Sequence, residues 1–178
     1  MNTRAAAVYS PVMRRLLLLA LLIVSPHGAA RAQTDPMAPL RFLIGDWQAI
    51  DAAPGESGSF TFALAVQDHV IVRTNEARYA ATAAAPASRH DDLLVIYVDN
   101  GSLKADYFDS EAHVIRYAVE ARPSNVVVFL SDASPRDPRY RLTYTAAAGG
   151  VLIGSFEVAP PGSADGFKPY LSWKARKR

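Results

Sequence analysis

The sequence predicts an all-β fold, an antiparallel up-and-down barrel or a sandwich, of about 8–10 strands with little helix. One observation is that apolar and polar residues alternate with a period of two, as in residues 139–145, where Tyr140, Leu142 and Tyr144 share one face. A second is that turn-forming residues separate these runs about every 8–14 residues. A third is that no stretch after the leader keeps the helical period of about 3.6 residues.

The first 32 residues have the features of a signal peptide. Basic residues near the start precede an unbroken apolar run over residues 16–24, and Ala30-Arg31-Ala32 is a cleavage site of the small-x-small type. The apolar run is shorter than the roughly 20 residues that cross a bilayer. We therefore expect cleavage after Ala32 and a soluble mature protein, periplasmic or secreted, with no membrane span after processing.

Removing the leader reverses the sign of the net charge. The chain carries 19 Lys and Arg against 17 Asp and Glu, and four of the arginines lie in the leader, so the mature chain has 15 against 17, a net charge of −2. Residues 174–178 form a basic cluster that is too short for a nucleic-acid surface. Because the chain has no cysteine, disulfides, thiolate metal sites and a cysteine nucleophile are excluded.

The mature chain divides into a short lead-in and one domain. Residues 33–39 are polar and contain proline, so we expect a flexible segment, and residues 40–178 have the size of a single β-barrel domain. At the start of this domain, Gly45 stands two positions before Trp47 in an apolar stretch. Glycine allows a sharp turn and an indole fills a large apolar space, so this element is expected to seal one end of the barrel.

The remaining elements follow in chain order. Phe60 and Phe62 alternate with small or polar residues in one strand, residues 70–79 form a β-branched run, and residues 80–88 are a loop. Asn100-Gly101 is the strongest hairpin signal, because both residues tolerate positive φ. Further strands are expected at residues 93–98, 103–109, 114–121, 126–130, 139–145, 151–158 and 167–175.

Two of these strands do not alternate. Residues 93–98 and 126–130 are apolar at every position, so both of their faces need cover. In a barrel the outer face is then covered by another segment or by a second protomer. A homodimer through these surfaces is therefore one expectation.

The triplet His90-Asp91-Asp92 carries the most reactive side chains of the chain. It suits a metal site, or a base with a carboxylate that orients it. Adjacent strand residues face opposite sides, however, so His90 and Asp91 do not share one pocket, and the alternative is an ordinary cluster where a strand begins. His69, His90 and His113 could converge as metal ligands, but they lack a short-range motif. We predict no metal, no cofactor and no catalytic residue.

Aromatic residues on the inward faces are the best candidates for a binding site. They either fill the barrel or line a ligand cavity with tyrosine hydroxyl groups at its mouth. Arg73 stands among apolar residues and either faces an acidic ligand inside the barrel or points to solvent. The predicted ligand-binding residues are Phe60, Phe62, Arg73, His90, Tyr107, Tyr117, Tyr140 and Tyr144.

Gly45-Asp46-Trp47 followed by an all-β meander resembles the Gly-x-Trp opening of the calycin superfamily, which includes the lipocalins. Ala105-Asp106-Tyr107 matches the second lipocalin motif, Thr-Asp-Tyr, in part. The resemblance implies that a basic residue near the end of the chain, Lys174 or Arg176, covers the tryptophan at the base of the barrel. Ala49 and Asp51 stand where nitrobindin-like haem barrels have glycine, so no haem is predicted.

The chain is also similar over most of its mature length to exported bacterial proteins with a calycin-like barrel and no assigned chemistry. The segments that carry this similarity are residues 42–47, 107–109 and 140–145. The predicted function is binding of a small, mainly apolar or amphipathic ligand without catalysis. One alternative is a hydrolase or isomerase type of enzyme that uses His90 and nearby acids. Another is a filled structural barrel that dimerises.

Overall fold

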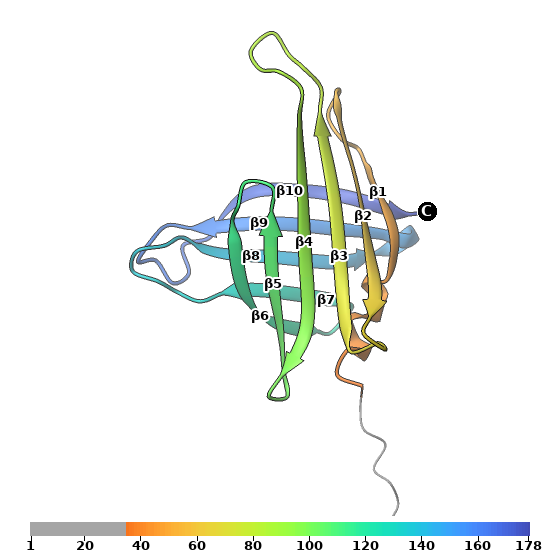
Figure 1. Cartoon of the computed structure of the whole chain (residues 1–178), viewed down its shortest axis with the longest axis vertical. Helices are drawn as coiled ribbons and strands as arrows, with labels where there is room; N and C mark the ends of the chain where they lie inside the picture. Colours follow the sequence, from red (N-terminus) through yellow and green to blue (C-terminus); the bar gives the residue numbers. More distant parts are fainter. Residues whose placement is uncertain (1–34) are drawn as a thin grey trace, which may run out of the picture. The chain divides into compact units, whose positions relative to one another are not determined.

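The computed structural model describes residues 35–178, and the predicted signal peptide lies outside them. Ten antiparallel strands form a closed barrel in which each strand pairs with its neighbour in sequence and β1 pairs with β10 (Figure 1). The up-and-down barrel predicted from the sequence is confirmed, and the sandwich is excluded. The strands are β1 (Gly45–Ile50), β2 (Glu56–Ala65), β3 (Val70–Tyr79), β4 (Ser88–Asp99), β5 (Ser102–Asp109), β6 (Val114–Arg122), β7 (Val126–Ser131), β8 (Arg139–Ala147), β9 (Val151–Ala159) and β10 (Lys168–Lys177).

The connections follow the turn residues of the sequence. Asn100 and Gly101 join β4 to β5 with φ of 48° and 77°, as expected for a tight hairpin. Residues 80–87 join β3 to β4 as a loop without a helical turn. Among residues 35–178, no helix has the length and hydropathy of a membrane span.

Strand β4 begins at Ser88, five residues earlier than the apolar run that predicted it. The extension is polar on both faces, so the hydrophobic pattern does not reveal it. It pairs with the polar end of β3, where Arg89 lies opposite Arg78 and Asp91 lies opposite Glu76. The extension places His90 and Asp92 inside a regular strand.

A short 3₁₀ helix, η1 (Ala38–Leu43), precedes β1 and contributes to the core. The carboxylate of Asp35 accepts hydrogen bonds from the backbone N–H of Met37 at 2.9 Å and from the guanidinium of Arg41 at 2.7 Å. The predicted lead-in runs into this helix, and its Met37 is only 2 % exposed. Leu40 and Leu43 are fully buried in the core, so η1 closes the interior of the barrel at the end where β1 begins.

Trp47 is buried directly behind η1. Its indole N–H donates a hydrogen bond of 2.7 Å to the carbonyl of Leu43, and its ring stacks on Phe60 with 6.2 Å between centroids. The polar edge of the indole is therefore satisfied, while its apolar surface faces the core. The expectation that Trp47 lies at one sealed end of the barrel agrees with this position.

The basic residue that covers Trp47 is Lys177, not Lys174 or Arg176. The ammonium of Lys177 lies 5.5 Å from the centroid of the indole. Lys177 pairs with Trp47 across β1 and β10, so the two side chains share a face, whereas Lys174 and Arg176 pair with Ile50 and Gln48 and point the other way.

The aromatic side chains next to this end fill the barrel. Phe62 and Phe129 are at most 1 % exposed and pack edge-on against Tyr144, with centroids 5.4 and 6.3 Å apart. Edge-to-face packing of this kind is the preferred geometry for aromatic rings. For this half of the barrel, the packing agrees with one of the two alternatives left open by the sequence, in which aromatic residues fill the interior.

The outer faces of the two apolar strands differ in exposure. In β7, Val128 pairs with the outward-facing Glu120 but is only 4 % exposed within one chain. On β4, β5 and β6, in contrast, the cross-strand neighbours Leu93, Phe108 and Val114 are 36, 41 and 56 % exposed. A homodimer interface therefore stays a prediction, with its strongest support on β4–β6 rather than on β7.

Replacing Gly45 with alanine tests the close contact between the start of β1 and Lys177, the residue that covers Trp47. Gly45 has φ of +136°, and a Cβ there would lie 2.2 Å from Cε of Lys177. We expect Gly45→Ala to lower the free energy of unfolding by about 2–4 kcal/mol, from backbone strain and from displacement of Lys177 off the indole. Denaturant unfolding measures the change.

Gly101→Ala is the matched control, because Gly101 also has positive φ but a Cβ there would meet no atom within 4 Å. Its expected cost is about 1–2 kcal/mol. Equal losses in the two variants would contradict the described packing around Gly45.

Candidate functional site

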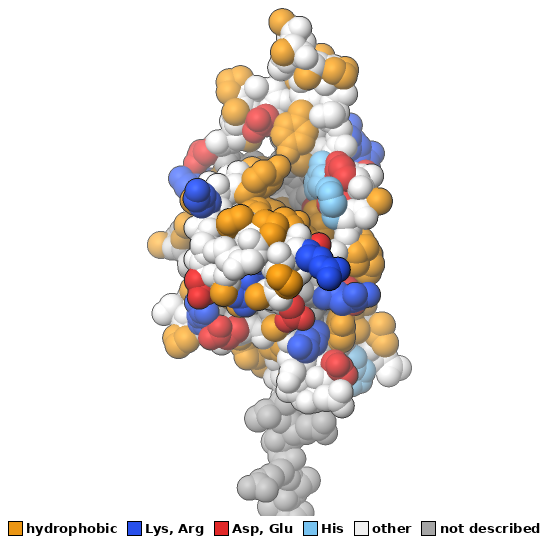
Figure 2. All heavy atoms as spheres, turned by 90° about the vertical axis from the view of Figure 1, so that its left-hand side faces the viewer, with side chains coloured by type: hydrophobic (Ala, Val, Ile, Leu, Met, Phe, Trp, Pro, Cys, Tyr) orange, Lys and Arg blue, Asp and Glu red, His pale blue; other side chains and the backbone are white. Residues whose placement is uncertain are grey.

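The end of the barrel opposite Trp47 is open. The connections β1–β2, β3–β4, β5–β6, β7–β8 and β9–β10 lie at this end, and inward-facing side chains near it are only partly buried. Figure 2 shows a recess between hydrophobic side chains on one side and histidine and acidic side chains on the other. The partly buried inward-facing residues are Asn75, His90, Tyr107, Tyr140, Phe156 and Trp173.

A buried ion pair lies between the filled half of the barrel and this open end. Arg73 on β3 donates hydrogen bonds to the carboxylate of Asp92 on β4 and to the hydroxyl of Tyr144 on β8. The side chains of Arg73 and Asp92 are each only 5 % exposed. Asn75 donates a further hydrogen bond of 2.9 Å to Asp92. Arg73 therefore points inward, and the ion pair ties three strands together.

The charge of Arg73 is secured by its neighbours. Burial alone would lower the pKa of Arg73, but Tyr144 and Asp92 outweigh it and hold the pKa above its usual value. Burial raises the pKa of Tyr144, so its phenol remains neutral. Within residues 35–178, Nε of Arg73 has no hydrogen-bond partner, although it is buried. This N–H is a donor that a bound molecule or water is able to satisfy.

His90 continues the polar network from Asp92 toward the surface. Its Nε2 lies 3.4 Å from Oδ2 of Asp92 and 3.3 Å from the hydroxyl of Tyr107. Its Nδ1 lies 2.8 Å from a carboxylate oxygen of Glu111. Asp91, which lies between His90 and Asp92 in the sequence, instead forms an ion pair with Arg89 outside the barrel at 2.8 Å. The alternation of a strand thus separates His90 and Asp91, as expected from the sequence.

The β5–β6 turn brings two more acidic side chains to His90. The carboxylate of Asp109 accepts hydrogen bonds from the backbone N–H groups of Glu111 and His113 at 3.0 and 2.8 Å, and from the His113 ring at 2.9 Å. Burial would raise the pKa of Asp109, but these bonds to His113 and Glu111 hold it below its usual value. Asp109 is therefore an anion whose position is fixed by the turn.

The three histidines that were weighed as metal ligands do not converge in the structure. His69 lies in the β2–β3 turn, at the end of the barrel where Asp35 and η1 are found, away from His90 and His113. The described residues instead bring together His90, Asp109 and Glu111, each offering one donor atom within 4.8 Å of the others. The sequence did not indicate this set, because a turn places Glu111 beside a histidine 21 positions earlier.

An apolar wall faces the polar network. The rings of Tyr140 and Phe156 are stacked with centroids 5.8 Å apart and an interplanar angle of 6°. Trp173 meets Tyr144 edge-on at 5.8 Å and lies over Gly154, where a Cβ would be 2.1 Å from the indole. The absence of a side chain at Gly154 thus makes room for the indole at the open end.

The predicted binding residues fall into separate groups. His90, Tyr107 and Tyr140 are partly buried at the open end, and Arg73 and Tyr144 form the boundary of the filled half. The other three, which are at most 5 % exposed, belong to the packed core: Phe60, Phe62 and Tyr117. Sequence reasoning missed Asn75, Phe156 and Trp173 as residues of the site, and it considered Asp92 only together with His90. Asn75 shares the inward period of Arg73 on β3, whereas no binding residue was predicted on β9 or β10.

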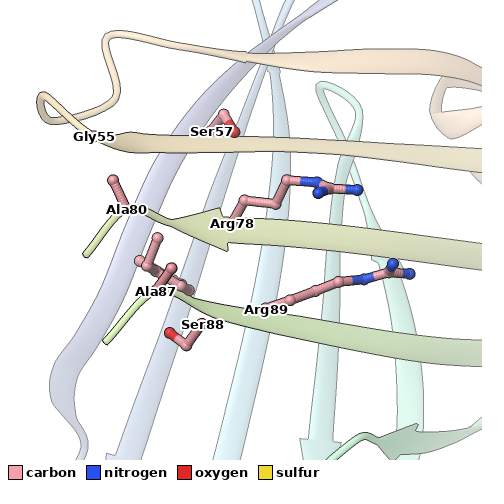
Figure 3. A pocket seen from close by; sticks show the side chains of 8 residues that line it. Gly55, Ser57, Arg78, Ala80, Ala87, Ser88 and Arg89 are labelled. Atoms are coloured by element: carbon pink, nitrogen blue, oxygen red, sulfur yellow. The ribbon is translucent and has the colours of Figure 1, made fainter. Parts of the chain in front are cut away.

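A wide groove of about 500 Å³ lies where β2, β3 and β4 extend beyond this end (Figure 3). Arg78 and Arg89 line it and run side by side along neighbouring strands. Both bond to Glu76, at 2.6 and 3.1 Å, so much of their charge is neutralised within the sheet. The groove is lined by Gly55, Ser57, Arg78, Tyr79, Ala80, Ala87, Ser88 and Arg89.

The chain matches no protein-family model and no curated protein sequence.

The geometry of the barrel provides a sealed base, a buried ion pair and an open end with one polar and one aromatic side. The neutral phenol of Tyr107 belongs to the polar side, because burial raises its pKa. This arrangement is suited to hold a molecule that has both a polar and an apolar part.

A double-mutant cycle tests the coupling of Arg73 and Asp92. Arg73→Met alone leaves a buried carboxylate without its cation, and we expect a loss of about 3–5 kcal/mol in the free energy of unfolding. Adding Asp92→Leu removes the orphaned charge, so the double variant should be more stable than the sum of the single losses predicts. Denaturant unfolding of all four proteins gives the coupling.

The exposed pair Arg122 and Glu120, at 2.7 Å, is the control. Its corresponding cycle, Arg122→Met with Glu120→Leu, should show no measurable coupling, because solvent screens exposed charges. Additive losses at Arg73 and Asp92 would contradict a buried ion pair.

Proposed function

We propose that the chain is an exported calycin-like barrel that binds a small, mainly apolar or amphipathic molecule in its open end, without catalysing a reaction. The observation that carries this proposal is the pairing of a sealed base with a partly exposed aromatic wall at the other end. Binding sites for small molecules are mostly apolar, with a few polar groups that fix orientation. The open end has this composition.

The two sides of the open end give the ligand an orientation. Its apolar part packs against Tyr140, Phe156 and Trp173, which are the partly buried rings of β8, β9 and β10. Its polar part points to Tyr107 and His90, whose hydroxyl and ring nitrogen lie 3.3 Å apart. Because Tyr107 is neutral, it donates a hydrogen bond to a carbonyl or hydroxyl oxygen of the ligand.

Export of the protein is part of the proposal and rests on the sequence. The leader of residues 1–32 would place the mature barrel in the periplasm or outside the cell. A barrel with a sealed base suits this location, because it shields an apolar molecule from water. No nucleic acid is expected as a partner, since the mature chain carries a net charge of −2.

Native mass spectrometry of the purified mature chain tests the proposal. We expect a non-covalent adduct that disappears on denaturation, and saturable binding of the fluorescent probe 1-anilinonaphthalene-8-sulfonate at one site per chain. Phe156→Ser should weaken probe binding more than tenfold, because it removes about 1.5–3 kcal/mol of apolar contact.

Phe108→Ser is the matched control, since Phe108 faces outward from β5 and is 41 % exposed. It should leave probe binding unchanged. A chain without an adduct, or equal weakening in both variants, would overturn the proposal. A dimer that only Phe108→Ser dissociates, with no adduct, would instead support a filled, dimerising barrel.

A second candidate function is an enzyme of the hydrolase or isomerase type. The observation that favours it is that His90 contacts both Asp92 and Tyr107, which is an arrangement for moving a proton. Turnover of a panel of esters and lactones that is lost in His90→Ala would support this function. Substrate binding without turnover would support the non-catalytic barrel.

A further inference from the structure

The cluster of His90, Asp109 and Glu111 at the open end offers a metal site. We propose that these three residues bind one divalent transition-metal cation, with Zn²⁺ as the representative ion. The proposal goes beyond the small-molecule function and does not depend on it. One donor atom from each residue lies within 4.8 Å of the other two. In a tetrahedral zinc site with bonds of about 2.0–2.2 Å, the donor atoms lie about 3.3–3.6 Å apart, so side-chain movements on the order of 1 Å bring these three atoms into range.

The orientation of His90 is set from the side opposite the proposed metal. Its Nε2 faces Asp92, which is itself held by Arg73 and Asn75. A histidine that binds a metal through one ring nitrogen typically donates its other N–H to a carboxylate, which fixes the tautomer. Nε2 lies 3.4 Å from Asp92 and 3.3 Å from the hydroxyl of Tyr107, and the 2.8 Å between Nδ1 and Glu111 fits a hydrogen bond that a metal would replace. Binding of the cation therefore requires that Nδ1 is deprotonated and that the carboxylate of Glu111 moves outward. In the proposed site, the cation lies between Nδ1 and this carboxylate.

Asp109 is the rigid member of the cluster. Its side chain is 6 % exposed and is fixed by the N–H groups of Glu111 and His113 and by the His113 ring. Carboxylates that bind metals are commonly held by such outer hydrogen bonds. Glu111, in contrast, is 49 % exposed and is held only by an exposed hydrogen bond of 3.2 Å from the Ser110 hydroxyl and by its contact with His90, so its side chain has room to adjust to a bound ion. His113 thus acts as a positioning residue for Asp109.

The charges around His90 favour a cation. Asp92, Asp109 and Glu111 contribute three carboxylates, and Arg73 compensates only the one on Asp92. A divalent ion between Asp109 and Glu111 would relieve the repulsion between their carboxylates. The imidazole ligand favours zinc and its neighbours in the first transition row over calcium, which prefers oxygen ligands. Three protein ligands leave a coordination position for water or another molecule at the mouth of the barrel.

Titration calorimetry of the mature chain, prepared without a histidine tag and freed of metal with a chelator, tests the site. We expect ZnCl₂ to bind at one ion per chain, with CaCl₂ at least tenfold weaker. Glu111→Gln and His90→Gln should each weaken zinc binding at least tenfold, since the loss of one ligand or outer partner typically costs 10–100-fold. Thermal unfolding should shift upward with zinc in the wild-type chain but not in these variants.

Matched substitutions elsewhere on the chain serve as controls. Glu120→Gln on the outside of β6 and His69→Gln at the sealed end should bind zinc as the wild-type chain does. Phe156→Ser should also retain zinc binding. Failure of the small-molecule proposal can therefore be distinguished from failure of the zinc proposal. No zinc binding by the wild-type chain, or equal loss in Glu111→Gln and Glu120→Gln, would overturn the proposed site.

Discussion

The burial of Trp47 is the constraint on which the rest of the structure depends. Its indole is hydrogen-bonded to Leu43, stacked on Phe60 and covered by Lys177, so η1, β1, β2 and β10 meet around one side chain. A barrel of ten strands has two ends, and this contact seals one of them. Access to the interior is therefore restricted to the opposite end, where the partly buried polar and aromatic side chains lie.

The ion pair of Arg73 and Asp92 marks where the packed interior ends. Toward Trp47 the space is filled by rings that meet edge-on, and a buried charge there would have no partner. Toward the open end, Asp92 is linked to Asn75 and His90, which leads to Tyr107 and Glu111. A buried cation thus costs desolvation, and in return it orders a series of polar groups that reaches solvent.

Most of the correct structural predictions came from the alternation of apolar and polar residues with a period of two. It predicted the barrel, the burial of Phe60, Phe62, Tyr117 and Tyr144, and the separation of His90 from Asp91. It did not reveal the polar extension of β4, because Ser88–Asp92 has no apolar face. It also did not identify Lys177, whose place depends on strand register, or the approach of Glu111 to His90, which depends on a turn. Contacts between residues that are far apart in the sequence depend on the register of the strands, and this register cannot be derived from a single sequence.

Fluorescence quenching of the chain's two tryptophans tests most directly whether one end is sealed and the other open. Trp173→Phe leaves only Trp47, which is 5 % exposed, and Trp47→Phe leaves only Trp173, which is partly buried at the open end. Acrylamide should quench the emission of Trp173 strongly and that of Trp47 weakly. Strong quenching of Trp47, or a Trp173 that is shielded to the same degree, would contradict a barrel with one sealed base.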